Sequence, residues 1–285
     1  MKKVLLFLCL TFSLSYTLAF AFVALGGRWN TPEAYLVGVG YMFVPMVVAV
    51  AVQKLYREPV KEPLGISWRL NRWWLFAWFL PPAVALATLG VSLLLPGVGY
   101  SPGMEGFFER FKDVLPPERL EAMKRQSEAL PVHPFWLSLV QGLVAGITVN
   151  AVAGFGEELG WRGLLYRELS FLGFWRSSAL IGAIWGIWHA PLILQGHNYP
   201  QHPVAGVFMV TAWCMLLSPI FSYVRLKAGS VVAAAVLHGS LNATSGLALM
   251  LVKGGSDLTV GVTGVSGFIV LGAVDFGICL SLRRR

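Results

Sequence analysis

Long apolar stretches alternate with short polar segments along the whole chain. A bilayer core is crossed by about 20 apolar residues in a helix. Runs of roughly that length predict eight spans. They lie at roughly 4–25, 34–53, 73–95, 134–153, 177–195, 204–224, 230–250 and 259–281. The pattern therefore predicts an all-α fold, a polytopic transmembrane bundle of about eight helices.

The composition supports a membrane protein. Apolar residues make up 56% of the 285 residues and charged residues only 13%, whereas soluble domains have about 25% charged residues. The net charge of +8 comes from basic residues in short loops between apolar runs. That placement is typical of orientation in a bilayer and argues against nucleic-acid binding, because no basic groove with interleaved aromatic residues is present. The three cysteines lie inside apolar runs and are interpreted as small hydrophobic residues.

The distribution of basic residues predicts the orientation. With the N-terminus in the cytoplasm, the inside segments carry most of the basic residues, including Lys2, Lys3 and the tail Arg283–Arg285. The short outside loops carry only Arg28 and Lys253. This asymmetry predicts that both termini are cytoplasmic and that the number of crossings is even. The first run also looks like a signal peptide, but its apolar core exceeds the usual length of about 7–15 residues, which favours an uncleaved helix.

A long outside loop covers residues 96–133, and its acidic and basic residues nearly balance. Leu120, Met123 and Leu130 are spaced along one side of a helix. We expect a surface helix that lies on the outer leaflet. A substrate gate is the alternative.

The first polar cluster within the apolar pattern is the segment 154–169. Glu157 and Glu158 are adjacent, so on a helix their side chains point about 100° apart and serve different roles. Glu158 and Arg162 have the i, i+4 spacing of an ion pair. Glu157 lacks such a partner, and Asn150 lies two turns before it on the same face. The alternative interpretation is a helix end with solvated charges.

Two histidines lie inside later apolar runs. His189 comes one turn after Trp185 and just before Pro191, and His238 lies one turn before Asn242. His189 could instead pack between helices with a bond to a backbone carbonyl, and the later pair could be polar glue between helices. Because ionisable groups within spans are costly, we expect the three clusters to share one cavity that opens toward the cytoplasmic half. Glu157 lies near the cytoplasmic end of its helix, whereas both histidines lie roughly 8–13 residues in from the cytoplasmic ends of their helices and are therefore deeper.

These residues form a recognisable set of motifs. Glu157-Glu158 followed by Arg162 resembles the EExxxR motif of the CAAX-processing (Rce1-like, CPBP) family of intramembrane proteases. Trp185 with His189 resembles the second motif, FxxxH, with Trp in place of Phe. His238 with Asn242 resembles the third, HxxxN. The resemblance covers roughly residues 134–250. It implies a catalytic helical core in 134–285, with the final helix included. Residues 1–133, with three helices and the long loop, then contribute membrane context only.

The resemblance implies an activity and roles for the residues. The protein would hydrolyse a peptide bond in a membrane-associated peptide or protein substrate, by CAAX-type or other C-terminal processing, in a bacterial or archaeal plasma membrane. Glu157 and His189 would activate water, His238 and Asn242 would hold the oxyanion, and Glu158 and Arg162 would support the site. Such donors and a base are what peptide hydrolysis requires.

Three alternatives stay open. Glu157, His189 and His238 would make a reasonable zinc set, although we favour a site without bound metal. An inactive scaffold or a bacteriocin self-immunity factor of the same fold would use the site to bind a partner. A secondary transporter would also place acids and histidines in the membrane, but no inverted repeat is visible between the two halves.

Overall fold

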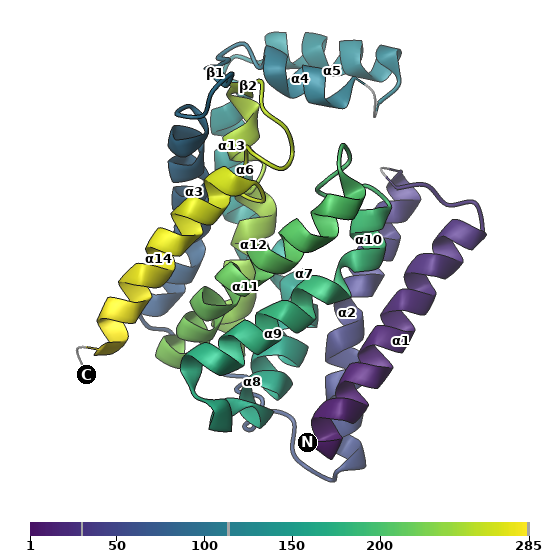
Figure 1. Cartoon of the computed structure of the whole chain (residues 1–285), viewed down its shortest axis with the longest axis vertical. Coiled ribbons are helices and arrows are strands. Elements are labelled where there is room, and N and C mark those ends of the chain that lie inside the picture. The colour runs from purple at the N-terminus through teal and green to yellow at the C-terminus, as the bar shows by residue number, and fades with distance from the viewer. Residues whose placement is uncertain (30, 113–114, 284–285) are drawn as a thin grey trace.

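The computed structural model of the protein describes residues 1–29, 31–112 and 115–283. Arg284 and Arg285 of the predicted cytoplasmic tail lie outside this range. The chain folds into a bundle of helices, with one short two-stranded ribbon at one end (Figure 1). The predicted all-α polytopic bundle is confirmed.

Within the described residues, six helical segments are long and apolar enough to cross a membrane on their own. They are α1 (Lys2–Ala24), α2 (Pro32–Leu55), α3 (Arg72–Ser92), α11 (Pro203–Ala228), the segment Val231–Met250 and α14 (Val265–Arg283). The segment Val231–Met250 contains two helices, α12 (Val231–Thr244) and α13 (Leu247–Met250). Together these segments account for six of the eight predicted spans.

The fourth predicted span is bent. Helices α6 (Pro134–Ile147) and α7 (Val149–Glu158) meet at Thr148, and the bent pair Pro134–Ile147 and Val149–Glu168 could form a seventh span with a 50° bend. The Thr148 hydroxyl donates to the carbonyl of Val144 at 2.8 Å. Such a bond within the last turn competes with the regular helical ladder. The bend therefore begins at a residue that satisfies its polar groups locally.

The fifth predicted span is divided into α9 (Phe174–Trp188) and α10 (Ala190–Leu194). With 15 residues, α9 is too short to cross a bilayer core alone. Pro191 lies in the first turn of α10 and has no backbone N–H, so it cannot continue the hydrogen bonds of α9. The predicted span thus exists as two helices that meet at His189.

After α7 the chain continues as η1 (Leu159–Leu165), a seven-residue π-helix, and then as α8 (Tyr166–Glu168). A short 3₁₀ turn, η2 (Ser170–Leu172), leads into α9. π-Helical turns are rare, and they often occur at functional sites. This one carries all three residues between Glu158 and Arg162.

The long loop forms a cap at the upper end of the bundle in Figure 1. It contains α4 (Glu105–Phe111) and α5 (Pro117–Glu128), next to the ribbon of β1 (Gly99–Tyr100) and β2 (Val252–Lys253). The expected surface helix is therefore present as α5, and Leu120 is its buried residue.

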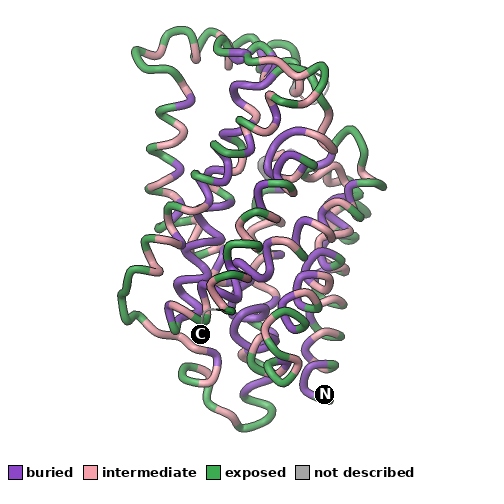
Figure 2. The backbone as a smooth tube through the Cα atoms, turned by 60° about the vertical axis from the view of Figure 1, so that its left-hand side comes forward, coloured by how far each residue is buried: buried purple, intermediate pink, exposed green. Residues whose placement is uncertain are grey.

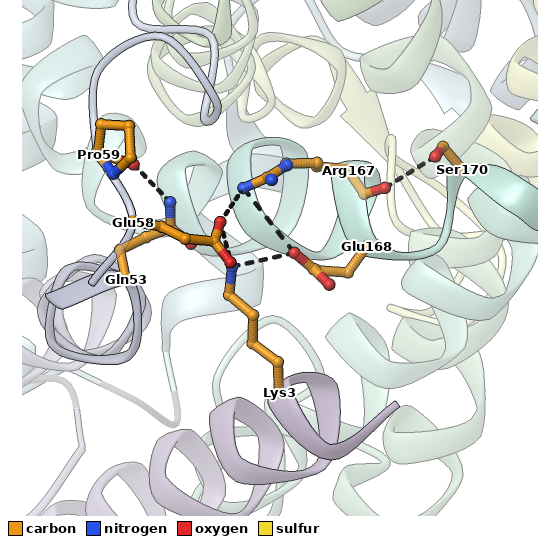
Figure 3. A network of polar contacts seen from close by, with 7 residues as sticks. All are labelled: Lys3, Gln53, Glu58, Pro59, Arg167, Glu168 and Ser170. Carbon is orange, nitrogen blue, oxygen red and sulfur yellow. Dashed lines mark hydrogen bonds and ion pairs between the residues drawn. The ribbon is translucent and has the colours of Figure 1, made fainter. Parts of the chain in front are cut away.

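At the opposite end, polar contacts join three distant segments (Figure 3). Lys3 Nζ lies 2.9 Å from Glu58 Oε2 and 3.0 Å from Glu168 Oε1, and Arg167 also bonds to Glu58. We call Lys3, Glu58, Arg167 and Glu168 the Lys3 network. It joins the start of α1 and the loop after α2 to α8, which directly follows η1 in the chain. Figure 2 shows that buried residues run through the middle of the bundle between the two ends.

Candidate active site

The first motif brings three charged side chains into the interior. Glu157 and Glu158 end α7, and Arg162 lies on η1. All three are 2% exposed or less. The alternative of a helix end with solvated charges is therefore wrong for this structure.

Glu158 is the centre of the ionic contacts. Both of its oxygens lie 3.3 Å from Arg162 Nη1, as the i, i+4 spacing predicts. His238 Nδ1 lies 2.8 Å from Glu158 Oε1. A carboxylate oxygen only accepts, so Nδ1 of His238 carries a proton and donates it to this bond. The contact between Glu158 and His238, across two helices, was not predicted from the sequence.

Glu157 is held by indole groups. Trp185 Nε1 donates to Glu157 Oε2 at 2.6 Å, and Trp161 Nε1 donates to the same oxygen at 3.4 Å. Its other oxygen, Oε1, lies 3.8 Å from His238 Nε2. The expectation that Glu157 has no partner on its own helix is wrong, because Trp161 follows it by four residues. Trp185, the Trp of the second motif, could have been predicted as a hydrogen-bond donor to an acid, because its indole carries an N–H.

Arg162 lies between two aromatic rings. Its guanidinium carbon is 4.5 Å from the ring centre of Trp185 and 4.6 Å from that of Phe221. Cation–π contacts of this kind are strongest where water is excluded. Nε and Nη2 of Arg162 have no hydrogen-bond partner among the described residues. The aromatic faces and Glu158 therefore provide most of its stabilisation.

We call Glu157, Glu158, Arg162 and His238 the acid–histidine cluster. Close helix packing assembles it, because α12 contacts α6 and α7 at small residues. A Cβ added at Gly154 would lie 2.9 Å from His238 Cβ, and one at Gly239 would lie 2.3 Å from the Gly146 carbonyl oxygen. Small residues let helix backbones approach in this way. Small residues on both sides of this contact thus allow α12 to pack closely enough to bring His238 to Glu157 and Glu158.

The structure also tests the prediction that Glu157 and His238 lie at different depths in the membrane. Glu157 and His238 lie within 4 Å of each other despite their different distances from the helix ends. The bend at Thr148 and the π-helix alter the path of this segment, so residue counts do not measure its depth. The four side chains are 4% exposed or less. The structure therefore shows a closed cluster, where the sequence analysis expected a cavity open toward the cytoplasm.

His189 and Asn242 are placed differently. His189 Nδ1 lies 2.8 Å from the Trp185 carbonyl oxygen, the backbone contact that the alternative interpretation predicted. Because a carbonyl only accepts, Nδ1 donates and Nε2 is left available. Asn242 is exposed on α12, and its side chain makes no hydrogen bond with another described residue. The structure brings four of the six predicted site residues together and leaves His189 and Asn242 at its margin.

Helices α1 and α2 contact the motif segments directly. Phe7 packs edge-on against Trp161, with ring centres 5.8 Å apart, and Trp188 Nε1 donates to the Ser15 hydroxyl at 2.8 Å. Tyr41 donates to the Trp188 carbonyl at 2.6 Å. The expectation that residues 1–133 provide membrane context only is therefore wrong, because side chains of α1 and α2 form part of the wall around the site.

Among the described residues, no group of three or more His, Cys, Asp or Glu side chains is arranged to hold a metal ion. Glu158 occupies Nδ1 of His238, and two indoles occupy one oxygen of Glu157. His238 Nε2 and Glu157 Oε1 face each other, but His189 does not join them in such a group in this structure, and the mechanism proposed for the protein uses only its own side chains.

The sequence analysis also overlooked a carboxylate within a span. Asp275 lies on α14, and its Oδ1 is buried without a hydrogen-bond partner among the described residues. It lies on a different helix from every member of the acid–histidine cluster. We assign it no role in the site.

Comparison with known proteins agrees with the position of these motifs. Residues 134–244 match the family model described as Type II CAAX prenyl endopeptidase Rce1-like. A search of curated proteins found no match to the chain. The matched segment begins with α6, ends with α12 and includes all three motifs. Within an integral, multi-pass membrane protein, residues 134–244 therefore form a domain of the Rce1-like family of CAAX prenyl endopeptidases, a family of intramembrane proteases.

Proposed function

We propose that the protein is an intramembrane endopeptidase in which Glu157 activates the hydrolytic water. The observation that carries this proposal is the pair formed by Glu157 Oε1 and His238 Nε2, 3.8 Å apart in a buried site. This separation is too long for a direct hydrogen bond. A water molecule beside the pair can bond to both atoms. The site thus supports a general base and a second polar group around one water.

The surrounding contacts assign a direction to the chemistry. The two indoles hold Glu157 Oε2, so Oε1 is the oxygen that takes the proton. As the proton leaves, the water oxygen bonds to the carbonyl carbon of the substrate and the carbonyl oxygen becomes an oxyanion. The C–N bond then breaks, and Glu157 passes its proton to the leaving amine.

Glu158 and Arg162 orient His238. The bond from His238 Nδ1 to Glu158 fixes the ring, and a protonated His238 presents Nε2–H to the oxyanion. Asn242 lies one turn further along α12 and can add a second donor when substrate binds beside it. His189 Nε2 can hold the water or the substrate at the margin of the cluster. We infer that the substrate is a membrane-associated peptide or protein processed near its C-terminus.

The test is cleavage by purified protein in detergent or nanodiscs. The probes are membrane-anchored peptides that end in CAAX-type sequences, with and without a prenyl group. Glu157→Gln keeps the size of the side chain and removes the base, so we expect cleavage to fall to background. Glu168→Gln, a carboxylate of the Lys3 network, is the matched control and should cleave like the wild type.

Two further measurements test the roles within the site. Asn242→Ala should lower kcat by about 10²–10³-fold if Asn242 donates to the oxyanion. A chelator should leave cleavage unchanged. Full activity in Glu157→Gln would refute Glu157 as the base, whereas absence of cleavage by the wild type would favour the inactive scaffold or immunity factor. Loss of activity on chelation, restored by zinc, would replace the glutamate site with a metal site.

We also propose that both termini face the cytoplasm. The basic residues concentrate in the loops assigned to that side. The start of α1 and the end of α14 lie toward the same end of the bundle in Figure 1. Reporter fusions after residue 60 and at the C-terminus should both give cytoplasmic signals, and an external signal from either would reverse this assignment.

A further inference from the structure

The helix break at His189 leaves a buried carbonyl without its usual backbone partner. In an unbroken helix the Trp188 carbonyl would accept from the amide of Leu192. Here the Leu192 amide donates to His189 O at 2.9 Å. Pro191, the residue before it, has no N–H to offer. The Trp188 carbonyl must therefore find a donor elsewhere, because a buried carbonyl without a partner is costly.

The donor comes from another helix. The Tyr41 hydroxyl on α2 bonds to the Trp188 carbonyl at 2.6 Å, and Tyr41 is fully buried. Its ring also packs against the Trp188 ring, with centres 4.3 Å apart. One residue earlier, the Tyr16 hydroxyl on α1 donates to the Ile187 carbonyl at 2.8 Å. Two tyrosines from outside the family-matched segment thus bond to the end of α9.

Trp188 connects this end to both sides of the site. Its ring lies 4.9 Å from the His189 ring and 5.5 Å from the Trp161 ring, centre to centre. Trp161 in turn donates to Glu157. A shift of the Trp188 backbone would therefore move the imidazole of His189 and change the packing behind the Glu157 carboxylate.

We propose that Tyr41, with Tyr16 in support, is a positioning residue for the catalytic site. Its hydroxyl replaces the hydrogen bond that the Leu192 amide would donate to the Trp188 carbonyl in an unbroken helix, and so holds the end of α9 in the conformation that positions His189. This inference rests on the proposed function for its kinetic consequence. The replacement of a backbone donor by a tyrosine hydroxyl does not depend on the proposed catalytic mechanism.

The first test removes the hydroxyl alone. Tyr41→Phe keeps the ring, so we expect kcat to fall about tenfold, the effect of one hydrogen bond, with KM little changed. Tyr35→Phe is the control, since Tyr35 is on the same helix and is 69% exposed. It should leave kcat unchanged. If Tyr41→Phe does not fold in detergent, Tyr16→Phe provides the same comparison at the Ile187 carbonyl.

The second test restores the missing backbone donor. Pro191→Ala supplies an N–H for the Ile187 carbonyl and lets the Leu192 amide return to the Trp188 carbonyl. In that background Tyr41→Phe should change kcat by less than about twofold, because the two substitutions act on the same hydrogen bond. A general loss of packing would not be suppressed in this way. An equal loss in both backgrounds would overturn the proposal.

Hydrogen exchange separates this inference from the proposed function. Amides in the segment 186–194 should exchange faster in Tyr41→Phe than in the wild type, while those of α14 stay the same. If His189→Ala cleaves normally but the exchange difference is found, the proposed role of His189 is wrong, whereas the positioning of the end of α9 by Tyr41 is supported. If exchange in 186–194 is unchanged and the effects of Tyr41→Phe and Pro191→Ala on kcat are additive, the positioning role of Tyr41 is refuted. The assignment of Glu157 as the base is not affected by that outcome.

Discussion

The protein contains two groups of acids and bases that differ mainly in their exposure. In the Lys3 network, side-chain exposure ranges from 6% for Lys3 to 41% for Arg167, and Glu58 and Glu168 lie between these values. In the acid–histidine cluster no side chain is more than 4% exposed. The same types of charged group thus meet water in one region and are removed from it in the other.

The difference in exposure indicates different roles for the two regions, because the Lys3 network holds segments together and the buried cluster forms the candidate site. In the Lys3 network every cation contacts two carboxylates, which favours holding α1, the loop after α2 and α8 together. In the buried cluster, Arg162 Nε and Nη2 and Glu158 Oε2 have no hydrogen-bond partner among the described residues. A buried charge with incomplete partners adds little to stability. Its presence in the membrane therefore indicates a functional role.

The largest expected effect comes from removing the buried cation. Arg162→Ala leaves Glu158 without its charged partner and should lower the free energy of unfolding by about 3–5 kcal/mol. Arg167→Ala, in the Lys3 network, should lower it by only about 0–1 kcal/mol because water screens that pair. Thermal unfolding in one detergent compares the two variants. Equal losses would show that burial does not distinguish the regions.

A smaller effect is expected from crowding the helix contact beside the cluster. A Cβ at Gly239 would meet the Gly146 carbonyl oxygen at 2.3 Å and the Ala151 amide nitrogen at 2.4 Å. Gly239→Ala should therefore destabilise the protein by about 1–3 kcal/mol. Gly246→Ala is the matched control, since the space at that position is open. If both variants melt alike, close approach of α12 is not required to build the site.

The smallest effect concerns acid and the Lys3 network. Hydrogen bonds from Lys3 and then Arg167 hold the pKa of Glu58 below its ordinary value. A lowered pKa in the folded state stabilises the protein at pH values above the unfolded pKa of about 4.3, and the gain disappears as pH falls through the folded value. Near pH 7 the wild type should exceed Glu58→Gln in stability by less than about 1 kcal/mol.

Melting of both proteins between pH 7 and about pH 3 measures that difference. The two curves should converge as the solution becomes acidic. A gap that stays constant over this range would show that the charge of Glu58 contributes nothing and that only its shape matters.

Local patterns predicted much of the fold. Apolar runs of spanning length located the long helices, because lipid requires each backbone to satisfy its own hydrogen bonds. The i, i+4 spacing predicted the contact between Glu158 and Arg162, since such residues share one helix face. The rule that an apolar run of spanning length forms one helix failed for the fifth span. Pro191 was the sequence signal that the helix bends or ends beside His189, and the backbone bonds show that the run is divided there into two helices.

The site itself was predicted in part. The motifs identified Glu157 and His238 as neighbours, and their atoms lie 3.8 Å apart. They did not predict that His238 bonds to Glu158, that indoles hold Glu157, or that Asn242 is exposed. Each of these depends on how one helix is rotated against another, and spacing along a single helix carries no information on that rotation.

By itself, then, the sequence determined a helical membrane bundle, the residues of the three motifs and the pairs that lie one turn apart. These are local properties, set by helix geometry and by the cost of placing polar groups in lipid. The tertiary structure alone decided which carboxylate meets which histidine, and that Tyr41 on α2 bonds to the end of α9. The physical reason is that a bend at Thr148, a π-helix after Glu158 and a break at His189 reset the direction of the side chains that follow. Only the packing of α12 and α2 against those interruptions brings the groups together.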